Sequence, residues 1–485
     1  MTDLNSVARQ ALRDNGFVSD LDDAARRELD TLRLTDPTPD VRDLRALLWS
    51  SIDNAESRDL DQIEVAESLE GGAVRICIAI ADVDVLVPKG SAIDRHAAAN
   101  ATSVYTGIAV YPMLPEALST GLTSLSAGVN RLAVVIDLVF EADGTPRSHD
   151  VYRALVTNHA KLAYDSLGAW LEGRGPAPDL VARDQNLQAQ LWLQDRAASL
   201  LKTLREKAGA LEFETIEATT VGTGGKVTAI ALTRKNRARD LIEDFMIAAN
   251  VAIARYLAEQ HRSAIRRVVR VPKRWDRIVV LAAKFDTVLP AEPDARALSA
   301  FLGARRAADP LRFPDLSLSI VKLLGPGEYV LDRPGPADDE GHFGLAAPDY
   351  SHATAPNRRY ADLVTQRLVK AAIAKAPAPY TDEDLASMAA HCTERENAAN
   401  RVERLTRKAA AAILLQSHIG TVYDAIVTGV NQDGTYVRLL SPPAEGRVMR
   451  GEKGMDVGER VRVRLIATNP DRGFIDFEGI SQTTP

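Results

Sequence analysis

Residues 51–62 read Ser-Ile-Asp-Asn-Ala-Glu-Ser-Arg-Asp-Leu-Asp-Gln, and they place three aspartates where the chain is about to enter an apolar strand. If Asp59 and Asp61 are extended, the two-residue side-chain period puts both on one face, with Asp53 returning from the preceding turn. Convergent carboxylates repel one another unless a cation lies between them, and hard oxygen ligands suit magnesium. The stretch predicts a metal-dependent site, with a solvated acidic surface turn as the alternative.

The composition is that of an ordinary globular protein. Of the 485 residues, 46% are hydrophobic and 26% are charged, which disfavours disorder, collagen and coiled coil. The length suggests about three domains. No apolar run approaches the ~18 residues that span a bilayer, and the polar start does not resemble a signal peptide. We expect a cytoplasmic monomer that does not contact a membrane, with Cys77 and Cys392 reduced rather than in a disulfide or zinc site.

The net charge of -7 does not by itself indicate a nucleic-acid binder. Basic residues are nevertheless concentrated in two groups, either of which could line a nucleic-acid path and make binding salt-dependent. The second group also has the spacing of an exposed helix face, which is the commoner meaning of such a run. The groups are Arg262, Arg266, Arg267, Arg270, Lys273, Arg274 and Arg277, and then Arg401, Arg404, Arg407 and Lys408.

The first 44 residues are predicted to form a small helical unit closed by Pro37 and Pro39, and its size and pattern are compatible with a helix-turn-helix. The pattern then changes to sheet. Residues 73–81 and 132–140 are short, β-branched and mostly apolar runs, as expected of buried strands.

From about residue 181 the helical period dominates. The clearest helix is predicted between Ala238 and Tyr256, where apolar residues recur every three or four positions and indicate packing against the sheet. Residues 325–341, rich in Gly, Pro and acids, predict a long loop. Thr381 is expected to cap a helix that runs to about His418.

The last 65 or so residues consist of short alternating runs separated by turn signals, which predicts a small β-barrel of the OB type. OB-folds often bind single-stranded nucleic acid by combining aromatic rings with cations. Such residues interleave here, although each ring could instead fill the barrel. They are Tyr423, Tyr436, Phe474, Phe477, Arg438, Arg447, Arg450, Arg462 and Arg464.

Several ordered blocks give the chain a resemblance to the ribonuclease II/R (RNB) family over roughly residues 45–480. The first is the acidic stretch followed by Ala79-Ile80-Ala81-Asp82-Val83. Further blocks follow in the family's order. They are Thr102-Ser103-Val104-Tyr105, Tyr111-Pro112-Met113-Leu114-Pro115, Ala160-Lys161-Leu162-Ala163-Tyr164, Leu241-Ile242-Glu243-Asp244-Phe245-Met246, His342-Phe343-Gly344-Leu345, Pro356-Asn357-Arg358-Arg359-Tyr360-Ala361-Asp362 and Val402-Glu403-Arg404.

Behind the predicted helical unit at 1–44, the resemblance implies a mixed α/β catalytic domain at 45–418 and an OB-fold barrel at 419–485, which makes the protein α+β. It also implies a processive 3′-to-5′ exoribonuclease that takes single-stranded RNA by its 3′ end, uses Mg²⁺ and releases nucleoside 5′-monophosphates. Metal ions would orient the attacking water and stabilise charge on the phosphate.

The resemblance also assigns roles to residues. Asp53, Asp59, Asp61 and Gln62 would hold the metal, with Asp59 and Asp61 also catalytic. Arg358 would polarise the scissile phosphate with its fork of donors. Tyr105 and Phe213 would stack on bases, Glu243 would bond ribose hydroxyls, and Glu403 would modulate release of the RNA end. Tyr436 and Arg438 of the barrel would also contact RNA.

The sequence departs from the family at two positions in the site. Gln62 stands where the family usually has a fourth aspartate, and Asn357 stands in a family Ser-Pro-Ile segment that here reads Ala355-Pro356-Asn357. A neutral amide can still bind magnesium but adds no charge, so we expect a raised magnesium requirement. The rival hypothesis is an RNA-binding protein with a decayed nuclease site, and a nuclease acting on DNA is a third possibility.

A further departure is at the front of the chain. Barely fifty residues precede the acidic stretch, too few for the two cold-shock barrels that relatives often carry there. We expect the helical unit to replace them, or to leave the channel mouth more open to structured RNA.

Overall fold

The computed structural model describes residues 3–34, 36–214, 217–223, 226–233, 235–310, 312–335, 341–431 and 434–480. Seven strands of these residues form a central mixed sheet in the order β1-β8-β7-β4-β3-β2-β9. The bounds are β1 Arg42–Asp43, β2 Ser50–Asp53, β3 Gln62–Ser68, β4 Val74–Ala81, β7 Asn130–Phe140, β8 Pro146–Thr157 and β9 Ala160–Ala163.

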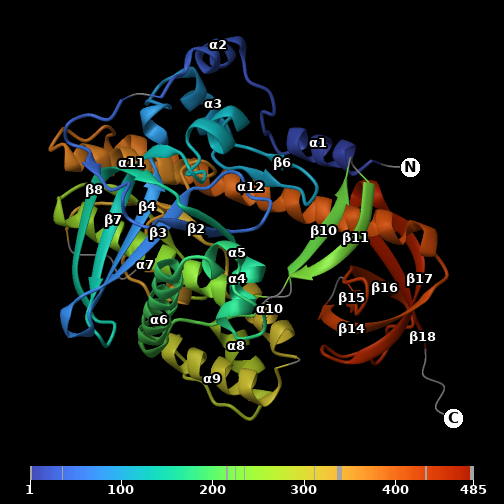
Figure 1. The fold of residues 1–485 in the computed structure, drawn as a ribbon. Coiled ribbons are helices and arrows are strands. Elements are labelled where there is room, and N and C mark those ends of the chain that lie inside the picture. The colour runs from blue at the N-terminus through green and yellow to red at the C-terminus, as the bar shows by residue number, and fades with distance from the viewer. Residues whose placement is uncertain are drawn as a thin grey trace.

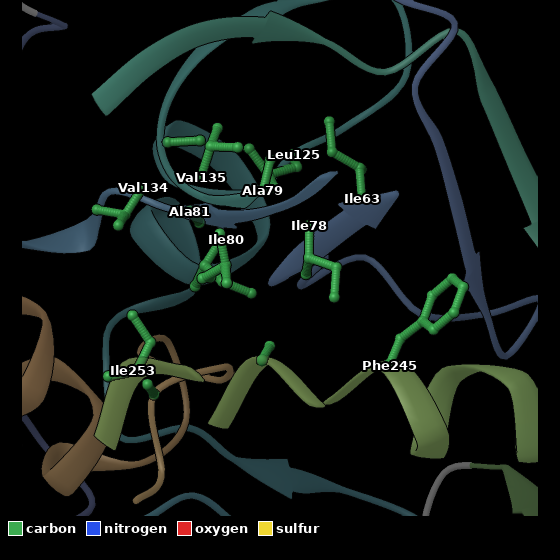
Figure 2. Packing of buried hydrophobic residues seen from close by; sticks show 14 of the residues in the cluster. Ile63, Ile78, Ala79, Ile80, Ala81, Leu125, Val134, Val135, Phe245 and Ile253 are labelled. Carbon is green, nitrogen blue, oxygen red and sulfur yellow. The ribbon is translucent and has the colours of Figure 1, made fainter. Parts of the chain in front are cut away.

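The two predicted apolar runs are the middle of this sheet. β4 and β7 pair antiparallel with Ile78 opposite Ile136. β4 is buried except at Arg75, and residues 133–136 in the middle of β7 are buried. Side chains alternate between the faces. Figure 2 shows Ile78 and Ile80 pointing toward α7, where Phe245 and Ile253 meet them. The prediction of buried strands here is confirmed.

Helices cover the sheet (Figure 1). The predicted amphipathic helix is α7, Arg237–Glu259, and its apolar face joins the main core as expected. It begins at Asn236, whose side chain accepts a hydrogen bond from Arg239 N. The other helices of this region are α3 Ala92–Asn100, α4 Tyr164–Leu171, α5 Asp179–Ala182, α6 Gln185–Ala208, α8 Trp275–Ala283, α9 Ala295–Ala308, α10 Phe313–Leu324 and α11 Tyr360–Ile373.

Helix α12, Asp382–Leu415, runs from the sheet to the C-terminal barrel (Figure 1). Thr381 starts it with a capping box, as predicted, because its hydroxyl accepts from Asp384 N while the Asp384 carboxylate accepts from Thr381 N. A 3₁₀ turn over Gln416–His418 continues it.

Five described strands then close into a barrel in the order β14-β15-β16-β18-β17, which confirms the OB-type prediction. The strands are β14 Val422–Asn431, β15 Gly434–Leu439, β16 Glu445–Arg450, β17 Arg460–Asn469 and β18 Phe474–Ile480.

The N-terminal unit contains two helices, α1 Leu4–Asp14 and α2 Asp23–Thr31. Its apolar side chains pack against the rest of the protein and do not form a separate hydrophobic core. Leu12 and Phe17 pack against Ala398 and Val402 of α12, and Val104 of the short strand β5, Val104–Tyr105, joins the same cluster. The unit is therefore fixed to the helix and strand that carry two predicted RNA-binding residues.

Two pairs of strands were not predicted. β10, Glu217–Thr223, pairs with β11, Lys226–Thr233, within a region expected to be helical. The expected loop at residues 325–341 is wrong in part, because it contains β13, Glu328–Asp332, which pairs antiparallel with β12, Ala264–Val268. Residues 336–340 of that loop lie outside the described part. Of the helices in the described part, none is long and apolar enough to cross a membrane.

Candidate active site

The predicted acidic stretch is the connection between β2 and β3. Asp53 ends β2 and Gln62 begins β3, so Asp59 and Asp61 lie in a loop rather than in a strand as expected. Asp53 Oδ1 accepts hydrogen bonds from Asn54 N at 2.6 Å and Ser57 Oγ at 3.0 Å. The loop is thus folded onto its own first aspartate.

Asp61 is the most buried of the three aspartates, with 2% of its surface exposed. Its Oδ1 accepts two hydrogen bonds from Asn357, at 3.1 Å from the backbone N and 2.9 Å from Nδ2. Asn357 is in turn bonded by Thr123, whose Oγ1 lies 2.6 Å from Asn357 Oδ1. Asn357 therefore fixes the Asp61 carboxylate, a role that the sequence interpretation did not assign to it.

Arg358 lies against the other oxygen of that carboxylate, with its Nε 3.6 Å from Asp61 Oδ2. Its backbone is held because Ser103 N donates to Arg358 O at 3.0 Å. The following residue, Arg359, is partly buried and forms a bidentate pair with Asp362, whose Oδ1 also accepts from Ala355 N. Arg358 itself stays half-exposed, so its guanidinium faces both Asp61 and solvent.

The pKa values of these acids reflect crowding and burial. Burial raises the pKa of Asp61 to about 7, against the lowering effects of Arg358 and of the Asn357 backbone bond. Burial also raises the pKa of Asp59, and the negative charge of Asp53 adds to the rise. Both carboxylates would be more stable as anions beside an additional cation.

The residues present fit magnesium by their chemistry. Asp53, Asp59 and Asp61 offer carboxylate oxygens and Gln62 an amide oxygen, which are the ligands that magnesium prefers. Within the described residues, however, no group of three or more His, Cys, Asp or Glu side chains could hold a metal ion. Asp61 Oδ1 is turned to Asn357, and Asp53 Oδ1 is turned to its own loop.

Tyr105 lies in the electrostatic field of this site. Burial raises the pKa of its hydroxyl to about 12, the charge of Arg358 lowers it, and the charges of Asp59, Asp61 and Asp53 raise it further. The residue as a whole remains 40% exposed. Its backbone N donates to Glu403 Oε1 at 2.9 Å, so the structure brings together Tyr105 and the predicted Glu403.

Phe213 and Glu243 line one cavity of about 300 Å³. Phe213 follows α6 and packs on the cluster formed by α8, α9 and α10, while Glu243 projects from α7 and pairs with Lys235 Nζ at 2.5 Å. The cavity wall is strongly charged, since Lys202 and Asp240 also line it. An aromatic ring and a carboxylate thus share a pocket large enough for a nucleotide-sized group.

Helix α7 connects this cavity to the aspartates. Arg239 is one turn before Glu243 on the same face. Its Nη2 donates to Asn54 Oδ1 at 2.9 Å, and its guanidinium lies 4.4 Å from the centre of the Tyr164 ring. Arg239 and Glu243 are about 6 Å apart along the helix axis by the 1.5 Å rise per residue, so one helix carries a residue that contacts the acidic loop and a residue that lines the cavity.

The predicted RNA-binding residues of the barrel differ in their exposure. Arg438 is 14% exposed at its side chain and pairs with Asp315 of α10 at 2.7 Å, so it joins the barrel to α10. Tyr436 is half-buried on the same strand. Phe477 is fully buried and fills the barrel, whereas Phe474 is exposed.

The two basic groups have different surroundings. Arg266, Arg267 and Arg270 form ion pairs with Asp332, Glu396 and Glu328, respectively, which join elements of the fold. The group from Arg401 to Lys408 lies on an exposed face of α12, as its spacing indicated.

A comparison with known protein families matches residues 41–375 to a model of the RNB domain. The chain belongs to the RNB family. A second model, for the RNase II-type exonuclease C-terminal S1 domain, matches residues 421–479, which form the barrel. The resemblance inferred from the ordered blocks is thereby confirmed.

Relatives of this RNB chain include two enzymes named ribonuclease R. That of Vibrio cholerae is 31% identical over 477 residues, covering 90% of this chain and 56% of the relative. That of Escherichia coli is 30% identical over 478 residues, covering 90% and 57%. The chain thus spans little more than half the length of these curated relatives. In fold the chain is similar to a solved structure of Mycoplasma genitalium RNase R in complex with ribose-methylated single-stranded RNA, with a TM-score of 0.88 and 21% sequence identity. The match covers 99% of this chain and 78% of the Mycoplasma chain.

Proposed function

We propose that this RNB chain is a magnesium-dependent, processive 3′-to-5′ exoribonuclease that hydrolyses single-stranded RNA to nucleoside 5′-monophosphates. The observation that carries the proposal is the Asp61 carboxylate, fixed at one oxygen by Asn357 and faced at the other by Arg358. The named relatives support the same reaction.

In this reaction a water oxygen bonds to the terminal phosphorus and the bond from phosphorus to the 3′ oxygen of the preceding nucleotide breaks. That oxygen takes up a proton, and the terminal nucleotide leaves as a 5′-monophosphate. Arg358 is assigned to the phosphate, because its half-exposed guanidinium can donate two parallel hydrogen bonds to phosphate oxygens. Its interaction with Asp61 holds it in place before RNA arrives.

Asp53, Asp59, Asp61 and Gln62 are assigned as the residues that would hold magnesium. When bound, the ion supplies an activated water and stabilises negative charge on the phosphate. Asn357 and Thr123 keep the Asp61 carboxylate in one orientation, with its other oxygen toward Arg358.

Tyr105 and Phe213 are assigned to the bases of the RNA end. A ring beside the acids and a second ring in the charged cavity would each present a face on which a base can stack. Glu243, in the cavity with Phe213, would accept hydrogen bonds from ribose hydroxyls and so favour RNA over DNA. Glu403, bonded to the Tyr105 backbone, would adjust how firmly the terminal nucleotide is held.

The barrel is proposed to bind RNA upstream of the site, through exposed Phe474 and half-buried Tyr436. Arg438 would contribute to RNA binding only by leaving Asp315. The helical unit at residues 1–44 is proposed to shape the entrance, because its first helix packs against both β5 and α12.

One chain supplies every residue assigned to the reaction, which supports action as a monomer. Cys77 and Cys392 are both buried free thiols, which fits the reducing cytoplasm.

The proposal is tested with a 5′-labelled single-stranded RNA incubated with magnesium, with EDTA, and with the Asp61→Asn variant. The matched control is Asp20→Asn, which makes the same change at an exposed position. We expect shortening of the RNA to a small labelled fragment by the wild type and the control only. Binding of the RNA without cleavage at any magnesium concentration would refute the proposal and indicate a decayed nuclease site.

A further inference from the structure

Glu64 is a buried carboxylate that none of the roles above uses. It lies on β3, in the middle of the sheet, and none of its surface is exposed. Neither of its carboxylate oxygens has a hydrogen-bond partner in the described part of the chain. Burying a carboxylate without a partner is strongly unfavourable, so such a group requires a cation, a proton or bound water close to it.

Glu64 is close to residues that are assigned to the proposed metal site. Gln62 is two residues earlier on the same strand, so the two side chains share one face of the sheet. Asp53 ends β2, the strand that pairs with β3 at Glu64. Burial raises the pKa of the Glu64 carboxyl, and the negative charge of Asp53 raises it further.

Ser50 adds a second unsatisfied group at the same place. It pairs directly with Glu64 across β2 and β3, and paired side chains of neighbouring antiparallel strands are about 5 Å apart at Cβ. Its Oγ is buried and also has no hydrogen-bond partner among the described residues. A carboxylate and a hydroxyl are thus placed side by side with unused oxygen atoms.

We propose that Glu64 supplies to the metal site the carboxylate that Gln62 does not provide. The ligand set on this side would then be Asp53, Gln62 and Glu64, with Ser50 donating a hydrogen bond to Glu64. This inference rests on the proposed function, because it concerns the same magnesium ion. Two carboxylates and an amide leave positions open for water and phosphate, as magnesium sites usually require.

This arrangement changes the metal affinity expected from the presence of Gln62. A neutral residue at that position alone would predict weak metal binding, but a carboxylate two residues later on the same face restores the negative charge. Gln62→Asp should therefore improve metal binding little in the wild type and substantially when Glu64 is neutral.

The test measures binding of Mn²⁺, as a probe for the magnesium site, by the loss of the free-ion electron paramagnetic resonance signal in the absence of RNA. Glu64→Gln is compared with Glu67→Gln, which makes the same change on the same strand at a residue paired with Arg75. We expect about tenfold weaker Mn²⁺ binding for Glu64→Gln, the lower end of losses seen when a metal site is altered. Glu67→Gln should bind as the wild type does, and Gln62→Asp should restore binding to Glu64→Gln.

A loss of less than threefold for Glu64→Gln, or no Mn²⁺ binding by the wild type, would overturn the inference and indicate a protonated core glutamic acid. If Glu64→Gln does not fold, Glu64→Asp gives the same test, since the shorter side chain draws the carboxylate back from the site. RNA hydrolysis by the wild type is measured separately, so failure of the proposed function is distinguished from failure of this inference.

Discussion

Replacement of Asp61 by Asn should stabilise the metal-free protein while it removes activity. Burial raises the pKa of Asp61 from the ordinary 3.8 to about 7, so the folded protein resists ionisation of this group more than the unfolded chain does. Each pKa unit corresponds to about 1.36 kcal/mol, and the free energy of unfolding lost on ionisation is therefore about 4 kcal/mol. Asn has the same shape and no charge, so the variant does not incur this loss.

The sign and the pH range follow from the two pKa values. A raised pKa in the folded state means that stability is present at low pH and declines as pH rises between about 3.8 and 7. The gain of Asp61→Asn over the wild type should accordingly be absent below that range, about 2 kcal/mol at pH 5 and about 4 kcal/mol at pH 8.5.

The assay is urea unfolding in EDTA at the two pH values, followed by tryptophan fluorescence, for which fully buried Trp49 provides a reporter in the main core. The exposed change Asp20→Asn is the control and should show no such gain. Equal or lower stability of Asp61→Asn at pH 8.5 would refute the reasoning that burial of this carboxylate is uncompensated without metal. In magnesium the gain should shrink, because the ion stabilises the wild-type anion.

Three further predictions concern residues around Asp61. Asn357→Ile should lower kcat about tenfold with little change in KM, because it removes a hydrogen bond to the charged Asp61 carboxylate that is worth roughly 1.5 kcal/mol. Steady-state kinetics measures this effect, and an unchanged kcat would contradict the positioning role of Asn357. Arg358→Lys should lower kcat by about 100-fold or more, because a point charge does not reproduce the fork of donors on the phosphate, and single-turnover hydrolysis measures it. Glu243→Gln should reduce the preference for RNA over DNA, and competition between labelled RNA and unlabelled DNA oligomers should show stronger inhibition by DNA than in the wild type.

Much of the architecture follows from local sequence. The central strands could be predicted because β4 and the middle of β7 are short apolar runs that lie buried inside the sheet. Helices α7 and α12 have unambiguous periodicity or capping, and the barrel strands are separated by clear turn signals. The order of motifs then pointed to the family, which the domain match confirms.

The structural features that could not be predicted from the sequence depend on contacts between residues distant in the chain. β12 and β13 are stabilised by pairing with each other across some sixty residues, so neither has a strong local signal. Asn357 reaches Asp61 across 296 positions, and the sequence showed only that an amide had replaced an apolar residue. Glu64 did carry a local sequence signal of a special role. It is a charged residue inside the buried strand Gln62–Ser68, where an apolar residue is expected.

The most direct test of the proposed reaction is the direction of hydrolysis and the identity of the first product. One RNA is labelled in the phosphate before its 3′-terminal nucleotide and, separately, at its 5′ end, and each is incubated with the wild-type chain and magnesium. We expect the first label to become a nucleoside 5′-monophosphate in the first turnover, while the 5′ label remains on a strand that shortens one nucleotide at a time. Early release of the 5′ label, or labelled fragments from internal cleavage, would contradict the proposed reaction.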